Sequence, residues 1–537
     1  MLLPELPIAF GLLSVTAASA LAARRLQIPI SIVLVVVGLA LGFMPFMPAI
    51  ALSPELVLSL FLPPLLYSSG VGMSWRGFRN HLRPILQLAV GCVVFTAAVV
   101  AGVLHWLLGV PLAVGFVLGA VVSPPDAVAP MAIARRHAVP GRILTVLEGE
   151  RLVNDATALI LFSFAVAAVV GGAAFSIPAA IGQFLVTVAC EIVWGLIVGW
   201  ASLALRRWAQ DTRVEMVFSL LTPFAAFWVP EVLGGSGVLA TVTCGLFVSW
   251  NGPRFISPAT RLQGFFVWDL VVYLVEGMIF LLTGLQARMI VDRLQSGDWN
   301  RVLLAAAAVC TAVIVVRFVW VFVVTYGPRL IWKPLRASEP APHWRQVFVV
   351  AFTGIRGVVS LAAALSIPFT AGGAPFPERD LLLLVTFAVI LVTLVGQGLS
   401  FSWVIKKLGL VDEGLQEAAD HKRQEIAARV KSIDAALSRL DALEGAATSP
   451  ETVEALRRRH SDRRAYFVAA CMDPSDDATL SSSDLQLRFV EAERASIADM
   501  YRRGEFHDDA RRRIERELDL EDSRLRHALQ SDVTRAL

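Results

Sequence analysis

Two carboxylates lie within apolar stretches of this 537-residue chain, at positions where a bilayer would surround them. Asp126 directly follows Pro124 and Pro125 in one stretch, and Asp155 lies inside the next. An ionised group at membrane depth is costly, so such residues are rare and usually mark an ion or proton path. The two aspartates therefore predict a cation site near the middle of the bilayer.

The proline pair interrupts the helix that carries Asp126. Pro124 and Pro125 lack backbone donors and clash with preceding carbonyls, so a regular helix cannot continue through them. Backbone left unpaired at this depth must be covered by protein or line a water-filled cavity. The freed carbonyls and the Asp126 carboxylate are hard oxygen ligands that suit an alkali cation. Alternatively, Asp126 only caps the second half of the helix, and the two roles can coexist.

The next stretch carries a cluster of charged and polar residues. Spacing of four places Arg151 and Asp155 on one helical face and Glu150 and Asn154 on another. Asp155 can meet Asp126 from the neighbouring span, and burial and like charge both favour the protonated form of such a pair. Proton and cation would then compete for the same oxygens. This competition is sufficient for antiport, because the site crosses loaded with one or the other but not empty.

Glu150 needs a counter-charge, and two intramembrane arginines are available. One is Arg317, and the other is Arg356, which lies in the glycine-interrupted segment 353–361. A second discontinuous helix in the sequence indicates a transporter site built from inverted repeats. Glu276 is a further buried acid, which we expect either to pair with an arginine or to form part of the site.

Composition indicates a polytopic membrane protein. Apolar residues make up 56% of the chain, the net charge is +3 and the mean hydropathy is +0.66. About thirteen apolar stretches reach bilayer-spanning length. They are 4–22, 28–46, 51–68, 84–107, 111–134, 143–171, 177–205, 214–231, 234–250, 266–287, 302–327, 346–369 and 381–405. The predicted fold is all-α, with about thirteen transmembrane helices, inverted repeats and two broken helices.

Basic residues gather in every second loop between these stretches. Lys and Arg favour the cytoplasmic side, so the pattern predicts an N-terminus outside and a C-terminus inside. Residues 1–410 form the predicted membrane domain, and residues 411–537 form a charged, helical cytoplasmic tail. The tail is either regulatory or a solvated appendage. The basic excess follows from the loops, so no nucleic-acid binding is predicted.

Three motifs resemble the signatures of bacterial NhaP-type sodium/proton antiporters of the monovalent cation:proton antiporter-1 family, which includes the animal NHE exchangers. The motifs are Ser123–Ala129, Leu147–Ala156 and Gly354–Ala363. The resemblance implies a homodimer of thirteen-span protomers in the bacterial plasma membrane. It further implies a six-helix core, crossed by two broken helices, that moves as an elevator and exchanges one cation for one proton electroneutrally.

The resemblance also assigns roles to individual residues. It makes Asp155 the essential carboxylate for ion and proton, with Asn154 as its partner in an Asn-Asp pair. Asp126 becomes the aspartate of the unwound helix, so both aspartates would ligate the transported Na⁺. Glu150 is implied to form an ion pair with Arg317.

Some positions match the family motifs less closely. Arg356 matches the arginine of the twelfth-helix motif. Arg151, however, stands where many members have a serine, and it could pair with Asp155 and lower its proton affinity. The segment from Ser123 to Asp126 lacks the threonine that is common in related bacterial proteins. The transported cation is therefore open among Na⁺, Li⁺ and K⁺.

Other functional classes fit the sequence less well. A K⁺/H⁺ antiporter with the same mechanism is the main alternative, followed by a cation channel. An intramembrane aspartyl protease would need Tyr-Asp and Gly-x-Gly-Asp motifs, and neither surrounds the two aspartates. The sequence contains no recognisable nucleotide loop, metal cluster or nucleophilic triad. We therefore predict no enzymatic activity and no cofactor.

Overall fold

The fold is almost entirely helical over the part of the chain that can be described. The computed structural model describes residues 5–45, 57–171, 177–292, 299–331, 341–371, 373–443, 450–472, 477–503, 514, 517–523 and 525–526. These residues fall into two compact units, Met1–Leu415 and Gln416–Leu537. Only two strands of two residues each, β1 (Thr370–Ala371) and β2 (Ala374–Pro375), occur among them, paired antiparallel.

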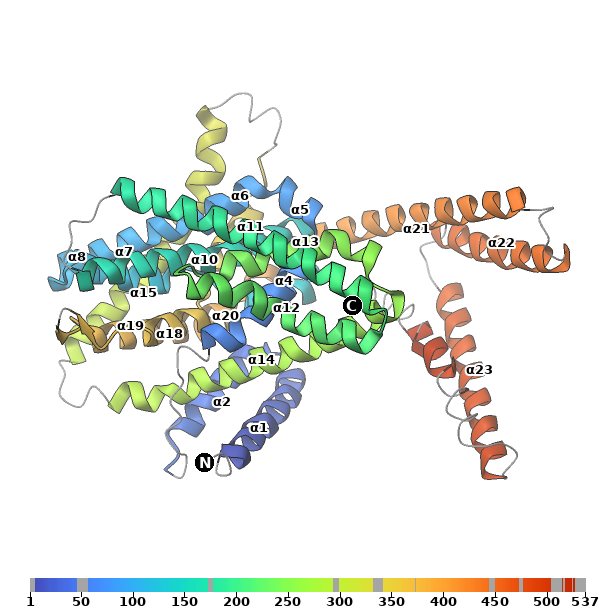
Figure 1. Cartoon of the computed structure of the whole chain (residues 1–537), viewed down its shortest axis with the longest axis horizontal. Coiled ribbons are helices and arrows are strands. Elements are labelled where there is room, and N and C mark those ends of the chain that lie inside the picture. The colour runs from blue at the N-terminus through green and yellow to red at the C-terminus, as the bar shows by residue number, and fades with distance from the viewer. Residues whose placement is uncertain are drawn as a thin grey trace. The chain divides into compact units, whose positions relative to one another are not determined.

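Unit 1 is a bundle of long apolar helices (Figure 1). Its first half contains α1 (Glu5–Leu26), α2 (Ile30–Gly42), η1 (Val57–Phe61), α4 (Leu62–Gly72), α5 (Trp75–Asn80), α6 (Leu82–Leu86), η2 (Gln87–Cys92), α7 (Val93–Leu108), α8 (Leu112–Val122), α9 (Val128–Arg136) and α10 (Gly141–Gly171). Its second half contains α11 (Ile177–Ala209), α12 (Thr212–Val232), α13 (Val238–Phe255), α14 (Pro258–Asp292), α15 (Trp299–Ile331), α17 (Trp344–Phe352), α18 (Val358–Leu365), α19 (Arg379–Leu391), η3 (Val392–Gln397), α20 (Gly398–Leu408) and the start of α21 (Leu410–Leu443). The η elements are π-helical turns.

The described part of each apolar stretch identified in the sequence is mostly helical. Among the described residues, six helices are long and apolar enough to cross a membrane. They are Leu82–Leu108, Gly141–Gly171, Gly182–Ala209, Ala259–Val291, Trp299–Ile331 and Arg379–Leu408. Ile30–Gly42, Val57–Gly72 and Leu112–Val122 are apolar but shorter. Six helices of the described residues thus have the length and composition of membrane spans, whereas the number of thirteen crossings stays a prediction.

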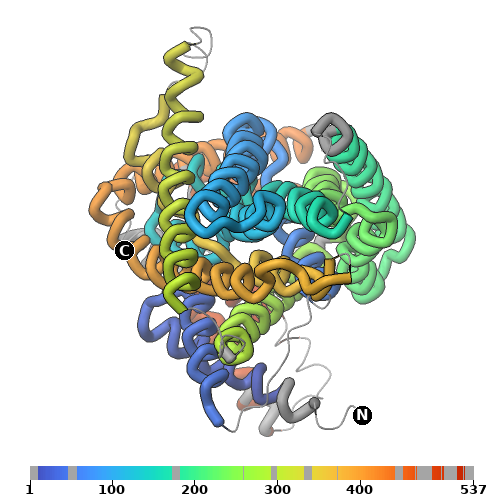
Figure 2. Tube along the Cα trace, turned by 90° about the vertical axis from the view of Figure 1, so that its left-hand side faces the viewer, coloured from blue at the N-terminus to red at the C-terminus, as the bar shows by residue number. Residues whose placement is uncertain are grey.

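Helices that are far apart in sequence pack closely where small residues allow it. α2 lies along α14, and α7 lies against α8 (Figure 1). A Cβ added to Gly38 or Gly284 would overlap backbone atoms of the facing helix, so glycine is required at this crossing. Small residues at helix contacts are typical of membrane bundles, where van der Waals packing drives association. Figure 2 looks nearly along many of these helices, and α15, in olive, crosses them.

Two helices of the bundle are interrupted in mid-course. α8 ends at Val122 and α9 begins at Val128, while α17 ends at Phe352 and α18 begins at Val358. The first break contains the Pro pair, and the second contains two glycines. Both breaks lie where the sequence predicts them. Apolar residues of both breaks are buried in hydrophobic clusters, Ala127 in one and Ile355 in another.

Unit 2 is helical and highly charged. It contains most of α21, together with α22 (Pro450–Met472) and α23 (Asp477–Arg502). Arg464 and Arg457 on α22 form ion pairs with Asp434 and Asp441 on α21, at 2.6 and 2.8 Å. Exposed pairs of this kind contribute little stability individually. The assignment of this unit as a cytoplasmic domain stays a prediction.

Candidate functional site

The two helix breaks meet, and a backbone hydrogen bond joins them. The amide of Asp126 donates to the carbonyl of Ile355 at 2.7 Å. The carboxylate of Asp126 accepts from the amide of Val128 at 3.0 Å, so it caps the first turn of α9. Gly357 lies against this carboxylate, and a Cβ there would overlap it. Both the capping and the close approach hold the Asp126 carboxylate at the meeting point.

Arg356 neutralises the end of α8. Its guanidinium donates from Nε to the carbonyl of Val122 at 2.8 Å and from Nη2 to that of Ser123 at 3.3 Å. It also donates to the carbonyl of Gly354. The last carbonyls of a helix have no partners within the helix and carry partial negative charge, which a cation stabilises. Arg356 therefore donates to the last carbonyls of α8, which lose their helical donors because the chain unwinds after Ser123.

Ser123 plays a local part in the same break. Its hydroxyl donates to the carbonyl of Ala120 at 3.0 Å, and its side chain is buried. The backbone carbonyl of Ser123, rather than its hydroxyl, contacts Arg356.

Four of the predicted site residues lie on α10, namely Glu150, Arg151, Asn154 and Asp155. Asn154 is fully buried and donates from Nδ2 to the carbonyl of Pro125 at 2.7 Å, so it holds the unwound segment against α10. Within the described residues, its Oδ1 has no hydrogen-bond partner. One residue further, Asp155 is 8% exposed as a whole residue, and it lines a cavity. Among the described residues, none donates a hydrogen bond to that carboxylate.

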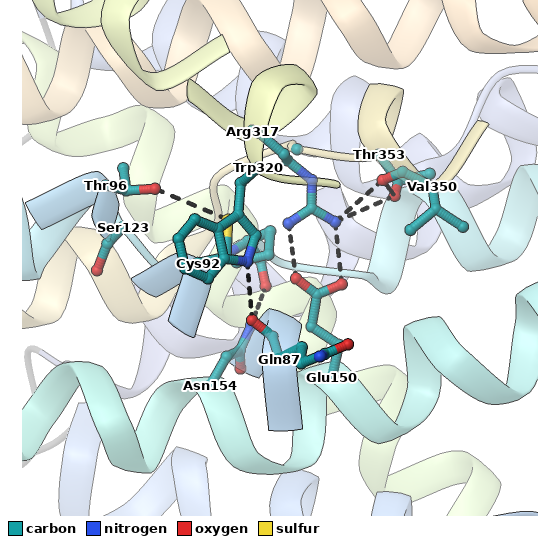
Figure 3. Close-up of polar contacts among 12 residues, drawn as sticks. Gln87, Cys92, Thr96, Ser123, Glu150, Asn154, Arg317, Trp320, Val350 and Thr353 are labelled. Atoms are coloured by element: carbon teal, nitrogen blue, oxygen red, sulfur yellow. Dashed lines mark hydrogen bonds and ion pairs between the residues drawn. The ribbon is translucent and has the colours of Figure 1, made fainter. Parts of the chain in front are cut away.

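Glu150 and Arg317 form a closed ion pair beside the break. Figure 3 shows two guanidinium nitrogens of Arg317 facing both carboxylate oxygens of Glu150. The two hydrogen bonds are 2.6 and 2.9 Å long. The side chains of Glu150 and Arg317 are only 2% and 1% exposed. Arg317 also donates to the carbonyl of Val350, at the end of α17, at 3.1 Å. This bidentate geometry is the strongest form of an arginine–carboxylate contact, and it ties α10, α15 and α17 together.

The cavity beside Asp155 has a volume of about 40 Å³. Three carboxylates line it, those of Asp126, Asp155 and Glu276, together with Arg151 and Ser360. A cavity of this size holds a water-sized particle. Carboxylate and hydroxyl oxygens are the ligands that hard cations prefer. The cavity therefore presents oxygens of the type that alkali cations and protons bind.

Arg151 reaches two of the three carboxylates. Its Nη2 lies 3.5 Å from Glu276 and its Nε lies 3.9 Å from Asp126. The sequence indicates that Arg151 could pair with Asp155, its neighbour one turn away; in the described part of the chain its ion-pair contacts are instead with Asp126 and Glu276. Asp126 in the first helix break and Glu276 on α14 compete for the guanidinium. Glu276 therefore belongs both to the cavity and to a contact with an arginine.

Some supporting groups were not found from the sequence. The hydroxyl of Thr393 in η3 accepts from the amide of Arg356 at 3.0 Å, which secures the second break. The indole of Trp320 donates to the carbonyl of Gln87 in η2 at 2.9 Å. π-helical turns often occur at functional sites. A threonine or tryptophan in an apolar span gives no signal that would distinguish these roles.

Known proteins have sequences similar to this one. The model of the sodium/hydrogen exchanger transmembrane family matches residues 11–407. An uncharacterized Na⁺/H⁺ exchanger of Mycobacterium tuberculosis is 33% identical over 510 residues, covering 94% of this chain and 93% of the relative. A sodium, potassium, lithium and rubidium/H⁺ antiporter of Bacillus pumilus is 32% identical over 381 residues, covering 68% of this chain and 56% of the relative.

A solved structure has a similar fold. The sodium proton antiporter MjNhaP1 from Methanocaldococcus jannaschii superposes with a TM-score of 0.60 at 18% identity, covering 75% of this chain and 99% of the other. The helical spans, the fold and the matches in sequence define a membrane transporter rather than an enzyme. The chain belongs to the sodium/hydrogen exchanger family, which confirms the resemblance carried by the three motifs.

Proposed function

We propose that this protein is a secondary active antiporter that exchanges Na⁺, or Li⁺ or K⁺, for H⁺ by competition at Asp155 and Asp126. The observation that carries the proposal is the cavity at the meeting point of the two helix breaks, lined by three carboxylates. Either a proton or a metal cation can neutralise the repulsion between neighbouring carboxylates. Because both use the same oxygens, binding of one displaces the other.

Each predicted residue has a role in this proposal. Asp155 is the exchanging carboxylate, because it faces the cavity without a hydrogen-bond donor among the described residues. Asp126 contributes oxygens while its backbone fixes the break. Asn154 and Arg356 are positioning residues, since they hold the unwound carbonyls. The closed pair of Glu150 with an arginine positions α10.

Arg151 acts in this proposal as a resident counter-charge. Its guanidinium shares the cavity with the carboxylates, so it makes the total charge of the cavity one unit less negative when no cation is bound. Glu276 holds it toward α14 at 3.5 Å. The entering cation must overcome the repulsion of Arg151, and Glu276 reduces that cost by keeping the guanidinium away from Asp155.

The charge balance supports electroneutral exchange. Replacing one bound monovalent cation by one proton leaves the total charge of the cavity unchanged. The two helix breaks belong to elements that contact each other and α10, so they can move as one body in an elevator-type cycle of alternating access. Thirteen spans and inverted repeats are part of the same proposal.

Placement in the cell follows from the loop charges and the family. We propose a bacterial plasma-membrane protein with the N-terminus outside and the C-terminus in the cytoplasm. Residues 1–410 form the membrane domain, and residues 411–537 form the cytoplasmic tail. Homodimers surrounded by membrane lipid are the proposed assembly.

K⁺/H⁺ exchange is a second candidate for the same site. It is favoured by the Bacillus pumilus relative, whose name includes four alkali cations. Arg151 at the cavity also favours weak selectivity, because a resident guanidinium restricts how closely the oxygens can close around a small ion.

Proteoliposomes that contain a pH-sensitive dye test the proposal. An imposed Na⁺, Li⁺ or K⁺ gradient should drive an opposite proton flux in the wild type, and Asp155→Asn should abolish it. Glu148→Gln is a matched control on the same helix, because Glu148 forms a pair with the exposed Arg135 and does not line the cavity. This control should retain full flux.

Two results would contradict the proposal. Full cation-driven proton flux in a folded Asp155→Asn variant would eliminate the shared carboxylate. Cation currents that persist without any proton movement would indicate the channel alternative instead.

A further inference from the structure

The carboxylate cavity has one neutral side-chain oxygen among the described residues that line it. The oxygen-bearing side chains there are the three carboxylates of Asp126, Asp155 and Glu276 and the hydroxyl of Ser360. A carboxylate accepts a proton as well as a metal cation, whereas a hydroxyl carries only a dipole and gains no proton in the physiological range. The hydroxyl of Ser360 therefore differs from the carboxylates in favouring a metal cation over a proton.

Ser360 is buried without a hydrogen-bond partner. The residue is 2% exposed, and its hydroxyl forms no hydrogen bond with the described residues. Hydroxyls in apolar helices commonly donate to the carbonyl one turn earlier. Those of Thr157, Thr283 and Thr386 do so in this protein, at 3.1, 2.8 and 2.7 Å. A buried hydroxyl that lacks this contact costs free energy, which a ligand in the cavity would offset.

The second helix break explains why Ser360 lacks the usual bond. α18 begins at Val358, so Ser360 is its third residue, and the residue four positions earlier, Arg356, precedes the helix. No helical carbonyl of α18 is therefore available to the hydroxyl. The same break places Gly357 directly against the carboxylate of Asp126. The start of α18 thus brings Ser360 to the cavity beside one of the exchanging carboxylates.

The hydroxyl of Ser360 keeps an open surface. It is not among the fully enclosed polar atoms without a partner in the described part of the chain, although the residue as a whole is buried. Ser360 lines the carboxylate cavity, so the open surface is available to a particle inside that cavity.

We propose that Ser360 is a ligand of the transported cation and favours the smaller alkali cations over K⁺. This inference rests on the proposed function, because it needs a cation in the cavity. A smaller cation holds its hydration water more tightly, so it depends more on the number of oxygens that replace this water. Ser360 thereby opposes Arg151, whose guanidinium limits how closely the carboxylates can surround a small ion.

Calorimetric titration of the purified full chain with NaCl, LiCl and KCl, at a series of pH values, compares the wild type with Ser360→Ala. At alkaline pH, the Kd for Na⁺ should rise about tenfold, the effect of losing one contact between a neutral group and an ion. The Kd for Li⁺ should rise at least as much, and that for K⁺ by about threefold or less. The pH below which acid weakens Na⁺ binding should stay the same, because the hydroxyl does not hold the competing proton.

Two further variants separate this role from a structural one. Ser366→Ala is the matched control, because Ser366 at the end of α18 donates to the carbonyl of Ala363 at 2.7 Å and does not line the cavity. This control should leave all three Kd values unchanged. Ser360→Thr keeps a hydroxyl and should retain the wild-type ratio of the Kd values for Na⁺ and K⁺.

Three results in folded Ser360→Ala would overturn the inference. They are an unchanged Kd for Na⁺, an equal rise of Kd for all three cations, and a displaced pH at which acid weakens Na⁺ binding. The last would mean that Ser360 acts on the Asp155 carboxylate rather than on the cation. A wild type that binds none of the three cations would contradict the proposed function itself, so the two failures are distinguishable.

Discussion

Two consecutive residues of α10, Glu150 and Arg151, form opposite kinds of ion pair. Glu150 and Arg317 are closed off from water, with two contacts of 2.6 and 2.9 Å and exposures of 2% and 1%. Arg151 lies 3.5 and 3.9 Å from Glu276 and Asp126, and these side chains are 18–24% exposed. The first pair has no room for an ion, whereas the second borders a cavity. A tight pair can hold helices together, and a loose one can be opened by a competing cation.

The largest effect should follow from breaking the closed pair. Glu150→Gln leaves Arg317 buried without its counter-charge, which costs about 3–5 kcal/mol of stability. We expect a strongly lowered unfolding temperature and loss of transport, measured on purified protein and in proteoliposomes. The double variant Glu150→Gln/Arg317→Gln should recover part of the stability, because no unpaired charge remains. An unfolding temperature unchanged by Glu150→Gln would show that the pair is not structural.

Removing the arginine of the loose pair, in contrast, should improve cation binding rather than abolish transport. Arg151→Ser removes a positive charge from the cavity, so it should strengthen cation binding by roughly tenfold, reflected in a lower KM for Na⁺. Proton binding should strengthen too, so the activity profile should shift to higher pH. The control Arg135→Ser removes an exposed arginine of an ion pair outside the cavity and should change neither quantity. A KM raised by Arg151→Ser would mean that the guanidinium assists the cation.

A smaller effect is expected at Glu276. Glu276→Gln frees the guanidinium of Arg151 to approach Asp126 and Asp155, so the KM for Na⁺ should rise by about threefold. Because the two residues are in contact, the double variant with Arg151→Ser should be non-additive. Additive changes in KM would separate Glu276 from Arg151 and assign it directly to the cation.

Sequence alone predicts the breaks well because their causes are local. Pro124 and Pro125 cannot continue a helix, and Gly354 and Gly357 weaken one. An ionisable residue in an apolar span is equally visible, so Asp126 comes with the break. What holds the breaks in place depends on distant residues and was not predictable.

Sequence alone does not tell which charged residues of the site form ion pairs with one another. Spacing along α10 makes Asp155 a natural neighbour of Arg151, yet the guanidinium contacts Asp126 and Glu276 from other helices. Residue types alone likewise leave Glu150 with two candidate arginines. The choice depends on how α15 and the second break are oriented, which is decided by tertiary packing. The π-helical turns are invisible for the same reason.

The smallest effect is predicted for His137, at the end of α9. Burial, followed by the nearby Lys406 and Arg136, holds the pKa of this imidazole below its ordinary value. The folded state thus disfavours the charged form, and any stability cost appears only as the pH falls below the unfolded pKa of about 6.5. His137→Gln should leave transport above neutral pH unchanged. A profile displaced in the alkaline range would make His137 a pH sensor.

The central claim is that a proton and a metal cation cannot occupy the carboxylate cavity together. Calorimetric titration of the purified protein with Na⁺ at a series of pH values tests it most directly. Over the acidic range the apparent Kd should rise about tenfold for each unit of pH lowered, as one proton competes for one site. An apparent Kd that does not change with pH would contradict the account.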